Sequence, residues 1–105
     1  MNEYTQRFKK AALEIHILAY SRESNPMDVT EYAKRPLKYA FLEEQQKMEN
    51  DYLSNKIQDS IEYYNMQAAL YRYYLKQLHL DPTLIVNSYN RRIQKKRDHL
   101  RDRFQ

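Results

Sequence analysis

The side chains best suited to metal binding or to acid–base chemistry in this chain are three histidines and one acidic run. The histidines are His16, His79 and His99. They lie on three separate segments, and none has the His-x-x-x-His or Glu-x-x-His spacing that places two ligands on one helix face. The acidic run comprises Glu43, Glu44, Glu49 and Asp51 on a predicted helix, a pattern typical of a solvated face.

Two missing residue types exclude most other chemistry. The chain has no cysteine, which removes disulfides, thiolate metal sites and a cysteine nucleophile. It has no glycine, which removes phosphate-binding loops, dinucleotide fingerprints and nucleophile elbows, because each needs a backbone that only glycine permits. We therefore expect no enzyme, no metal, no cofactor and no small-molecule substrate.

The elements that position these residues all show the helical period. At 105 residues the chain is predicted to be one domain, 1–105. Along the first segment apolar residues recur at steps of three and four: Tyr4, Phe8, Ala11, Ile15 and Leu18. A polar stretch that closes with Pro26 ends this segment.

The second helix is predicted to begin at Asp28. Asp28 and Glu31 have capping-box spacing, and Met27 and Tyr32 have the spacing of a hydrophobic staple. Pro36 disfavours helical geometry in the residue before it, so we expect this helix to be short and a new one to begin there.

No residue between 37 and 80 forces a break, yet one helix over that range would be ~65 Å long. We expect a break near Asn50–Asp51 or Ser54–Asn55, with Asn55 and Gln58 capping a new start. A basic helix over about 82–104 follows, with Asp81 as its N-cap. The predicted fold is all-α, a small bundle of four to five helices with one long central helix, which dimerisation would complete.

The tyrosine-rich helix 57–80 has two apolar arcs on nearly opposite faces. The first arc comprises Leu53, Ile57, Ile61, Tyr64, Ala68, Tyr71, Leu75 and Leu78. The second arc comprises Tyr52, Tyr63, Met66, Leu70, Tyr73 and Tyr74. The bundle itself would bury both arcs, or the second arc would bind another copy or another protein. Since the chain contains little aliphatic material, we favour a protein interface formed by the second arc.

The stretch LKQLHLDPTLIVNSYNRR, residues 75–92, resembles a helix-turn-helix. The resemblance implies that Thr83, Asn87, Ser88 and Arg91 face base edges, while Arg92, Lys95 and Lys96 meet phosphates. The stretch departs from the pattern at His79, where the turn usually has glycine, and at Leu84, which lies on the base-reading face. We therefore interpret Asp81–Pro82 first as a helix start.

The net charge of +4 resides in the last quarter of the chain, where residues 81–105 contain seven basic and three acidic side chains. This segment would neutralise phosphates of DNA or RNA, or its charges would only be solvated. The candidate nucleic-acid-binding residues are Thr83, Asn87, Arg91, Arg92, Lys95, Lys96, Arg97 and Arg101.

The sequence favours binding over catalysis. It contains no long apolar run that predicts a signal peptide or a membrane span, so we expect a cytoplasmic protein without a membrane partner. Its high Asn, Lys, Tyr and Ile content suits an AT-rich genome, such as that of a phage or other mobile element. The first functional hypothesis is a self-associating protein–protein interaction module, acting as an adaptor, chaperone or inhibitor of a larger assembly. The alternative is a nucleic-acid-binding protein.

Overall fold

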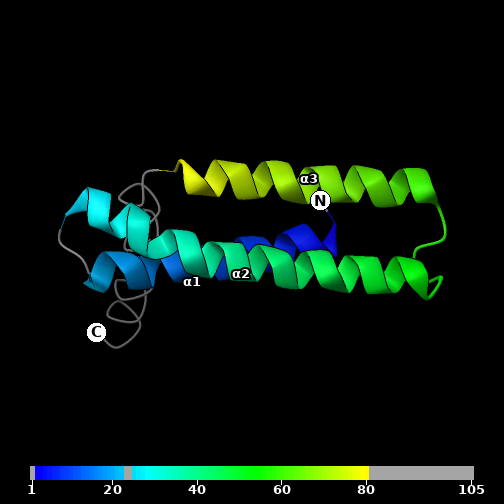
Figure 1. Cartoon of the computed structure of the whole chain (residues 1–105), viewed down its shortest axis with the longest axis horizontal. Coiled ribbons are helices and arrows are strands. Elements are labelled where there is room, and N and C mark those ends of the chain that lie inside the picture. The colour runs from blue at the N-terminus through cyan, green and yellow to red at the C-terminus, as the bar shows by residue number, and fades with distance from the viewer. Residues whose placement is uncertain (1, 23–24, 81–105) are drawn as a thin grey trace, which may run out of the picture.

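The computed structural model describes residues 2–22 and 25–80, and over these ranges the chain is entirely helical apart from its connections. The helices are α1 (Glu3–Arg22), α2 (Pro26–Leu53) and α3 (Ser60–Leu78). Figure 1 shows α3 running alongside α2, with α1 behind α2. The predicted all-α fold is confirmed at this level. The predicted helix 82–104 lies outside the described residues.

Asparagine side chains cap the starts of α1 and α2. Asn2 Oδ1 accepts a hydrogen bond from the backbone N–H of Thr5 at 2.8 Å, and Asn25 Oδ1 accepts one from Met27 at 2.9 Å. The predicted start of α2 at Asp28 is therefore wrong by two residues. Pro26 occupies the first turn, where a backbone N–H would have no partner within the helix, so its missing N–H costs no hydrogen bond. Asp28 lies in the same turn, near the positive end of the helix dipole.

Pro36 does not divide α2, which corrects the prediction of a short helix ending there. The first turns of α2 are inclined to the rest in Figure 1, as expected for a proline that removes one hydrogen bond inside a helix. Ala33, Leu37 and Phe41 stand on either side of Pro36 along one face, and all three are buried. Packing of this face outweighs a local penalty of ~3 kcal/mol.

The chain breaks between α2 and α3 at Asn55, which confirms the second of the two predicted positions and not the one at Asn50–Asp51. Asn55 has a φ of 64°. Its N–H donates to Tyr52 O, and the N–H of Lys56 donates to Asp51 O, the paired bonds of a Schellman motif. In a chain without glycine, asparagine takes this left-handed position because it tolerates positive φ better than other residues do. The cap of α3 is Asp59 and not Asn55 as predicted, with Oδ1 accepting from Ile61 N at 2.9 Å.

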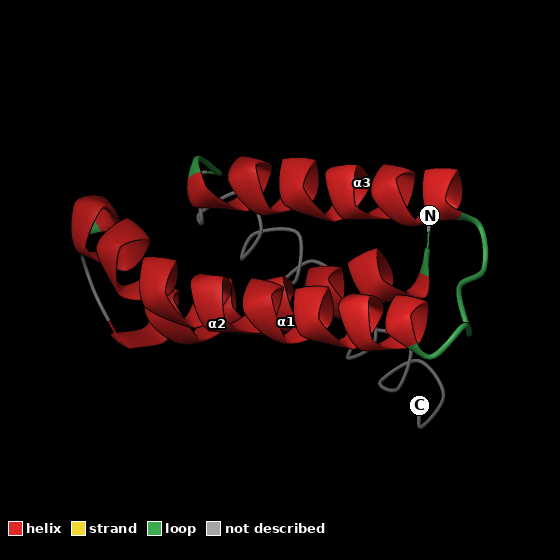
Figure 2. Cartoon of the chain, turned by 45° about the vertical axis from the view of Figure 1, so that its right-hand side comes forward, coloured by secondary structure: helices red, strands yellow, loops and turns green. Residues whose placement is uncertain are grey.

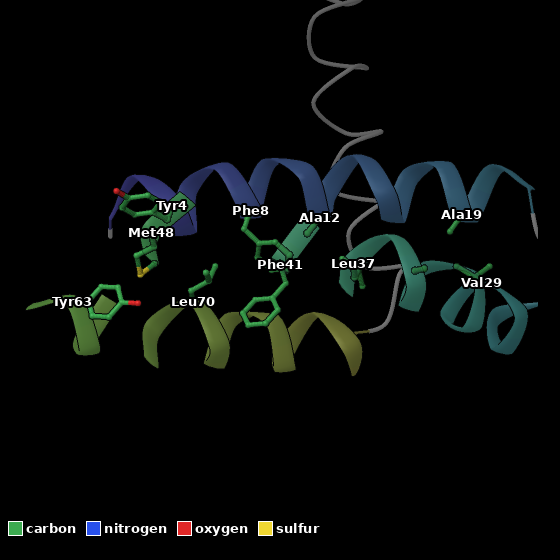
Figure 3. Packing of buried hydrophobic residues seen from close by; sticks show 11 residues of the cluster. Tyr4, Phe8, Ala12, Ala19, Val29, Leu37, Phe41, Met48, Tyr63 and Leu70 are labelled. Carbon is green, nitrogen blue, oxygen red and sulfur yellow. The ribbon is translucent and has the colours of Figure 1, made fainter. Parts of the chain in front are cut away.

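The core is a single layer of side chains between the three helices. Figure 3 shows it in sequence along the bundle, with Tyr4, Met48 and Tyr63 grouped towards one end and Ala19 beside Val29 at the other. Phe8 and Phe41 lie in the middle and contact each other edge to face, with ring centroids 6.4 Å apart. The buried apolar residues are Tyr4, Phe8, Ala12, Ala19, Val29, Ala33, Leu37, Phe41, Met48, Tyr63 and Leu70.

The molecule is elongated. Its principal extents are 54 × 36 × 16 Å, and its radius of gyration is 17.1 Å, against ~13 Å for a compact domain of this length. Figure 2 shows that, within residues 2–22 and 25–80, α3 has neighbours on one side only. None of the three helices is long and apolar enough to cross a membrane.

Candidate protein interface

The inner face of α3 is formed by the second, tyrosine-rich arc. Tyr63 and Leu70 are buried, and Met66, Tyr73 and Tyr74 are half-buried against the core. These residues contact both other helices because α3 lies over the groove between them. All five therefore belong to the hydrophobic core or its border.

Aromatic contacts fix this inner face. Tyr63 stacks on Tyr52 at the end of α2, with centroids 4.1 Å apart and planes 5° apart. Tyr74 stacks on Phe41 at 4.4 Å. Tyr73 meets the α1 ring of Phe8 edge to face at 5.9 Å. The predicted interface residues are thus placed together, but towards the interior: Tyr52, Tyr63, Met66, Leu70, Tyr73 and Tyr74.

The outer face of α3 is the middle part of the first arc, because Ile57 and Leu78 of that arc pack against the core. We define this outer face as Ile61, Tyr64, Ala68, Tyr71 and Leu75, which recur at steps of three and four and therefore lie in one row. Their large side chains are 71% (Ile61), 63% (Tyr64), 51% (Tyr71) and 37% (Leu75) exposed. A row of apolar side chains open to solvent is typical of an interaction site.

The inner face of α3 is covered by α1 and α2, whereas the outer face is covered by neither helix. A single helix can bury only the side that meets its neighbours, and both neighbours of α3 lie on the side of Leu70. The sequence contains apolar residues for both sides. The outer face is therefore the apolar face of α3 that is open to another molecule.

Polar side chains border the outer face on one edge. Asn65 and Arg72 flank Ala68 by helical position, and Lys76 follows in the last turn. None of the ion pairs found in residues 2–22 and 25–80 involves Arg72 or Lys76. An apolar row with a polar border has the anatomy of a protein interface, in which a hydrophobic centre is surrounded by a polar rim.

A groove of about 600 Å³ lies between the beginning of α2 and the end of α3. Its lining residues are Thr30, Lys34, Arg35, Lys38, Tyr74, Leu78 and His79. Lys34 pairs with Glu31 at 2.6 Å, and the Arg35 guanidinium lies over the Tyr39 ring at 5.7 Å. Lys38 has no ion-pair partner within the described ranges. The groove is lined by the basic side chains of Lys34, Arg35 and Lys38 and by the apolar side chain of Leu78.

Partly buried polar contacts join α1 to α2. Arg7 Nε on α1 donates to both carboxylate oxygens of Glu44 on α2 at 3.0 Å, and this hydrogen bond raises the pKa of Arg7. The Tyr4 hydroxyl donates to Asp51; burial, reinforced by this hydrogen bond, raises the pKa of Tyr4 to about 12. Each pair joins α1 to α2, and we assign both contacts a role in stabilising the fold.

The histidines and the carboxylates of the acidic run do not form a common site within residues 2–22 and 25–80. His16 is buried and His79 is exposed at the end of α3, while His99 lies outside the described residues. Glu44 is buried on Arg7, whereas Glu43 and Glu49 are exposed. Residues 2–22 and 25–80 contain no group of three side chains able to hold a metal ion.

All eight predicted nucleic-acid-binding residues lie outside the described residues: Thr83, Asn87, Arg91, Arg92, Lys95, Lys96, Arg97 and Arg101. The cationic groove was not predicted. The spacing of Lys34 and Lys38, one helical turn apart, is the sequence signal for it.

Comparison of this chain with protein-family models, with curated proteins and with solved structures finds no match.

Proposed function

We propose that this protein is a non-enzymatic helical interaction module that self-associates through the outer face of α3. The observation that supports the proposal is the exposure of Ile61, Tyr64 and Tyr71 in one row, on a helix whose other side is fully used by the core. The interface predicted from the sequence lies on the same helix but on the other arc, which contains Tyr63, Leu70 and Tyr74. The role as adaptor, chaperone or inhibitor rests on this binding surface.

The magnitude of burial favours the whole row over any single residue. Burying one large apolar side chain stabilises an interface by ~1.5–3 kcal/mol. Association costs ~4–15 kcal/mol in lost freedom. Leu18 near the end of α1 and Met27 at the beginning of α2 are also exposed, but as isolated residues they cannot offset that cost. The outer face can offset it, because each copy contributes four large side chains: Ile61, Tyr64, Tyr71 and Leu75.

Sedimentation equilibrium tests the proposal. We expect the wild-type chain to form a dimer at ~1–100 µM, the range in which a micromolar complex assembles. The variant Ile61→Lys/Tyr71→Lys should raise the dissociation constant on the order of 100-fold, because each copy would bury two charges in the interface.

The matched control is Leu18→Lys/Met27→Lys, which adds the same charge at exposed apolar sites away from α3. It should dimerise like the wild type, and circular dichroism should show equal helix content in all three proteins. A wild-type chain that stays monomeric across this range contradicts self-association.

The second candidate function is nucleic-acid binding, which a different observation favours. The cationic groove of Lys34, Arg35 and Lys38 includes His79, next to the point where the basic residues 81–105 follow in the sequence. A cationic groove of this kind would bind phosphates without base readout.

A further inference from the structure

We infer that two copies of this chain pair through the outer face of α3 in an antiparallel arrangement, with the two-fold axis at Ala68. The inference rests on the proposed function, and it adds the orientation and register of the partner. It follows from three features of the described residues: the spacing of the row, the size of its central residue and the charge of the two ends.

The row is symmetric about Ala68. Ile61 and Leu75 lie seven residues before and after it, and Tyr64 and Tyr71 lie four before and three after. A two-fold axis through Ala68 therefore places Ile61 of one copy opposite Leu75 of the other, with the tyrosines facing each other between them. Each exposed side chain of the row then meets an apolar side chain.

The central residue permits close approach. Ala68 is exposed and has the smallest side chain of the row. Helix axes come as near as ~8 Å only where the side chains at the crossing point are small. With Ala68 at the crossing, the longer side chains of Tyr64 and Tyr71 can extend across the partner helix and bury both flanks of the contact.

The charge distribution selects the orientation. Residues 43–62, at the end of the bundle where α3 begins, contain six acidic and two basic side chains. The other parts of α2 and α3, residues 26–42 and 63–80, contain two acidic and five basic side chains. A parallel pair would bring like ends together, whereas an antiparallel pair brings the acidic end of each copy beside the basic end of the other. The dipoles of the two α3 helices also oppose each other in this arrangement.

Cross-linking between single cysteines tests the orientation, and the chain offers a clean background because it contains no cysteine. In the antiparallel pair, residue 61 of one copy lies opposite residue 75 of the other. The two copies of residue 61 are separated by fourteen helical steps, ~21 Å, which a short bismaleimide linker cannot span.

We expect a mixture of Ile61→Cys and Leu75→Cys proteins to give a cross-linked dimer, and Ala68→Cys to cross-link with itself. Ile61→Cys alone and Leu75→Cys alone should remain uncross-linked. Leu18→Cys, exposed away from α3, measures random collision.

Efficient cross-linking of Ile61→Cys with itself would overturn the antiparallel orientation. Absence of cross-links in every combination, together with a dimeric mass of the same variants in sedimentation, would overturn the pairing through this face. A monomeric mass for the wild type would instead refute the proposed self-association, so that the two failures are distinguishable.

Discussion

His16 and Gln77 form a buried polar contact between α1 and α3. His16 Nε2 lies 3.1 Å from Gln77 Oε1, so the neutral imidazole donates its Nε2 hydrogen to the amide oxygen. His16 is 2% exposed, and its Nδ1 has no hydrogen-bond partner among the residues that the structure describes. Burial lowers the pKa of His16, and the hydrogen bond to Gln77 opposes this only in part. The site accommodates a neutral histidine and disfavours a charged one.

The free energy of unfolding should therefore fall in mild acid. With a folded-state pKa below the ordinary value of ~6.5, His16 binds fewer protons in the folded than in the unfolded protein. Its stabilising contribution is complete above that ordinary value and is lost as the pH falls below it. Urea unfolding at about pH 7.5 and about pH 5.5 should show a larger difference for the wild type than for His16→Gln.

The control for this measurement is His79→Gln, because His79 is exposed. It should retain the pH dependence of the wild type. Equal pH dependence in the wild type and in His16→Gln would contradict the assignment to His16.

At the scale of the element, α3 is a helix with two apolar faces and one set of neighbours. Leu70 on the inner face is 1% exposed and Leu75 on the outer face is 37% exposed. The two leucines have the same chemistry and lie five residues apart in sequence. What distinguishes them is only whether α1 and α2 cover their side of the helix.

Truncating these two leucines should have different consequences. Leu70→Ala should lower the free energy of unfolding by ~2–5 kcal/mol, because it leaves a cavity in the core. Leu75→Ala should lower the stability of the monomer by less than ~1 kcal/mol while weakening self-association. Urea unfolding at low protein concentration measures the first effect, and sedimentation measures the second. Equal losses of stability would contradict the placement of the two faces.

In the described molecule as a whole, the charges of α2 and α3 differ between the two ends of the long axis. The groove end has Lys34, Arg35 and Lys38, and the opposite end has most of the carboxylates of α2 and the α2–α3 connection. This polarity favours the antiparallel pair, and it also adds a cationic surface to the nucleic-acid alternative, which was predicted from the basic residues 82–104.

Fluorescence anisotropy with DNA and RNA tests that alternative. If the chain binds nucleic acid, the logarithm of its affinity should fall linearly with the logarithm of the salt concentration. Lys34→Gln/Lys38→Gln should weaken binding at least ~10-fold at low salt, about 1.4 kcal/mol. Lys9→Gln/Lys10→Gln, which removes the same charge from exposed positions on α1, should weaken it less.

Equal weakening by the two double variants would show that the groove makes no specific contribution. Absence of binding by the wild type at low salt would refute the nucleic-acid alternative altogether.

The helical class could be predicted from the sequence, and so could a break at residues 54–55 as one of two candidate positions, because both follow from local chemistry. The three- and four-residue periodicity has no competing strand pattern, and Asn55 is the local substitute for glycine in a left-handed position. The two-faced character of α3 is also local, since it depends only on the spacing of apolar residues. The local preference of proline for the first turn of a helix predicted a new helix at Pro36. This prediction was wrong, because the burial of Ala33, Leu37 and Phe41 on one continuous face outweighs that preference.

Which face of α3 is buried depends on contacts between helices and could not be predicted from the sequence. Periodicity shows that Tyr63, Leu70 and Tyr74 share a side, but it does not show which side meets α1 and α2. The stacking of Tyr63 on Tyr52 and of Tyr74 on Phe41 decides it, through contacts between residues 11 and 33 positions apart in sequence. The outer face, and with it the proposed interface, follows from that choice, because a helix with neighbours on one side leaves its other side to solvent.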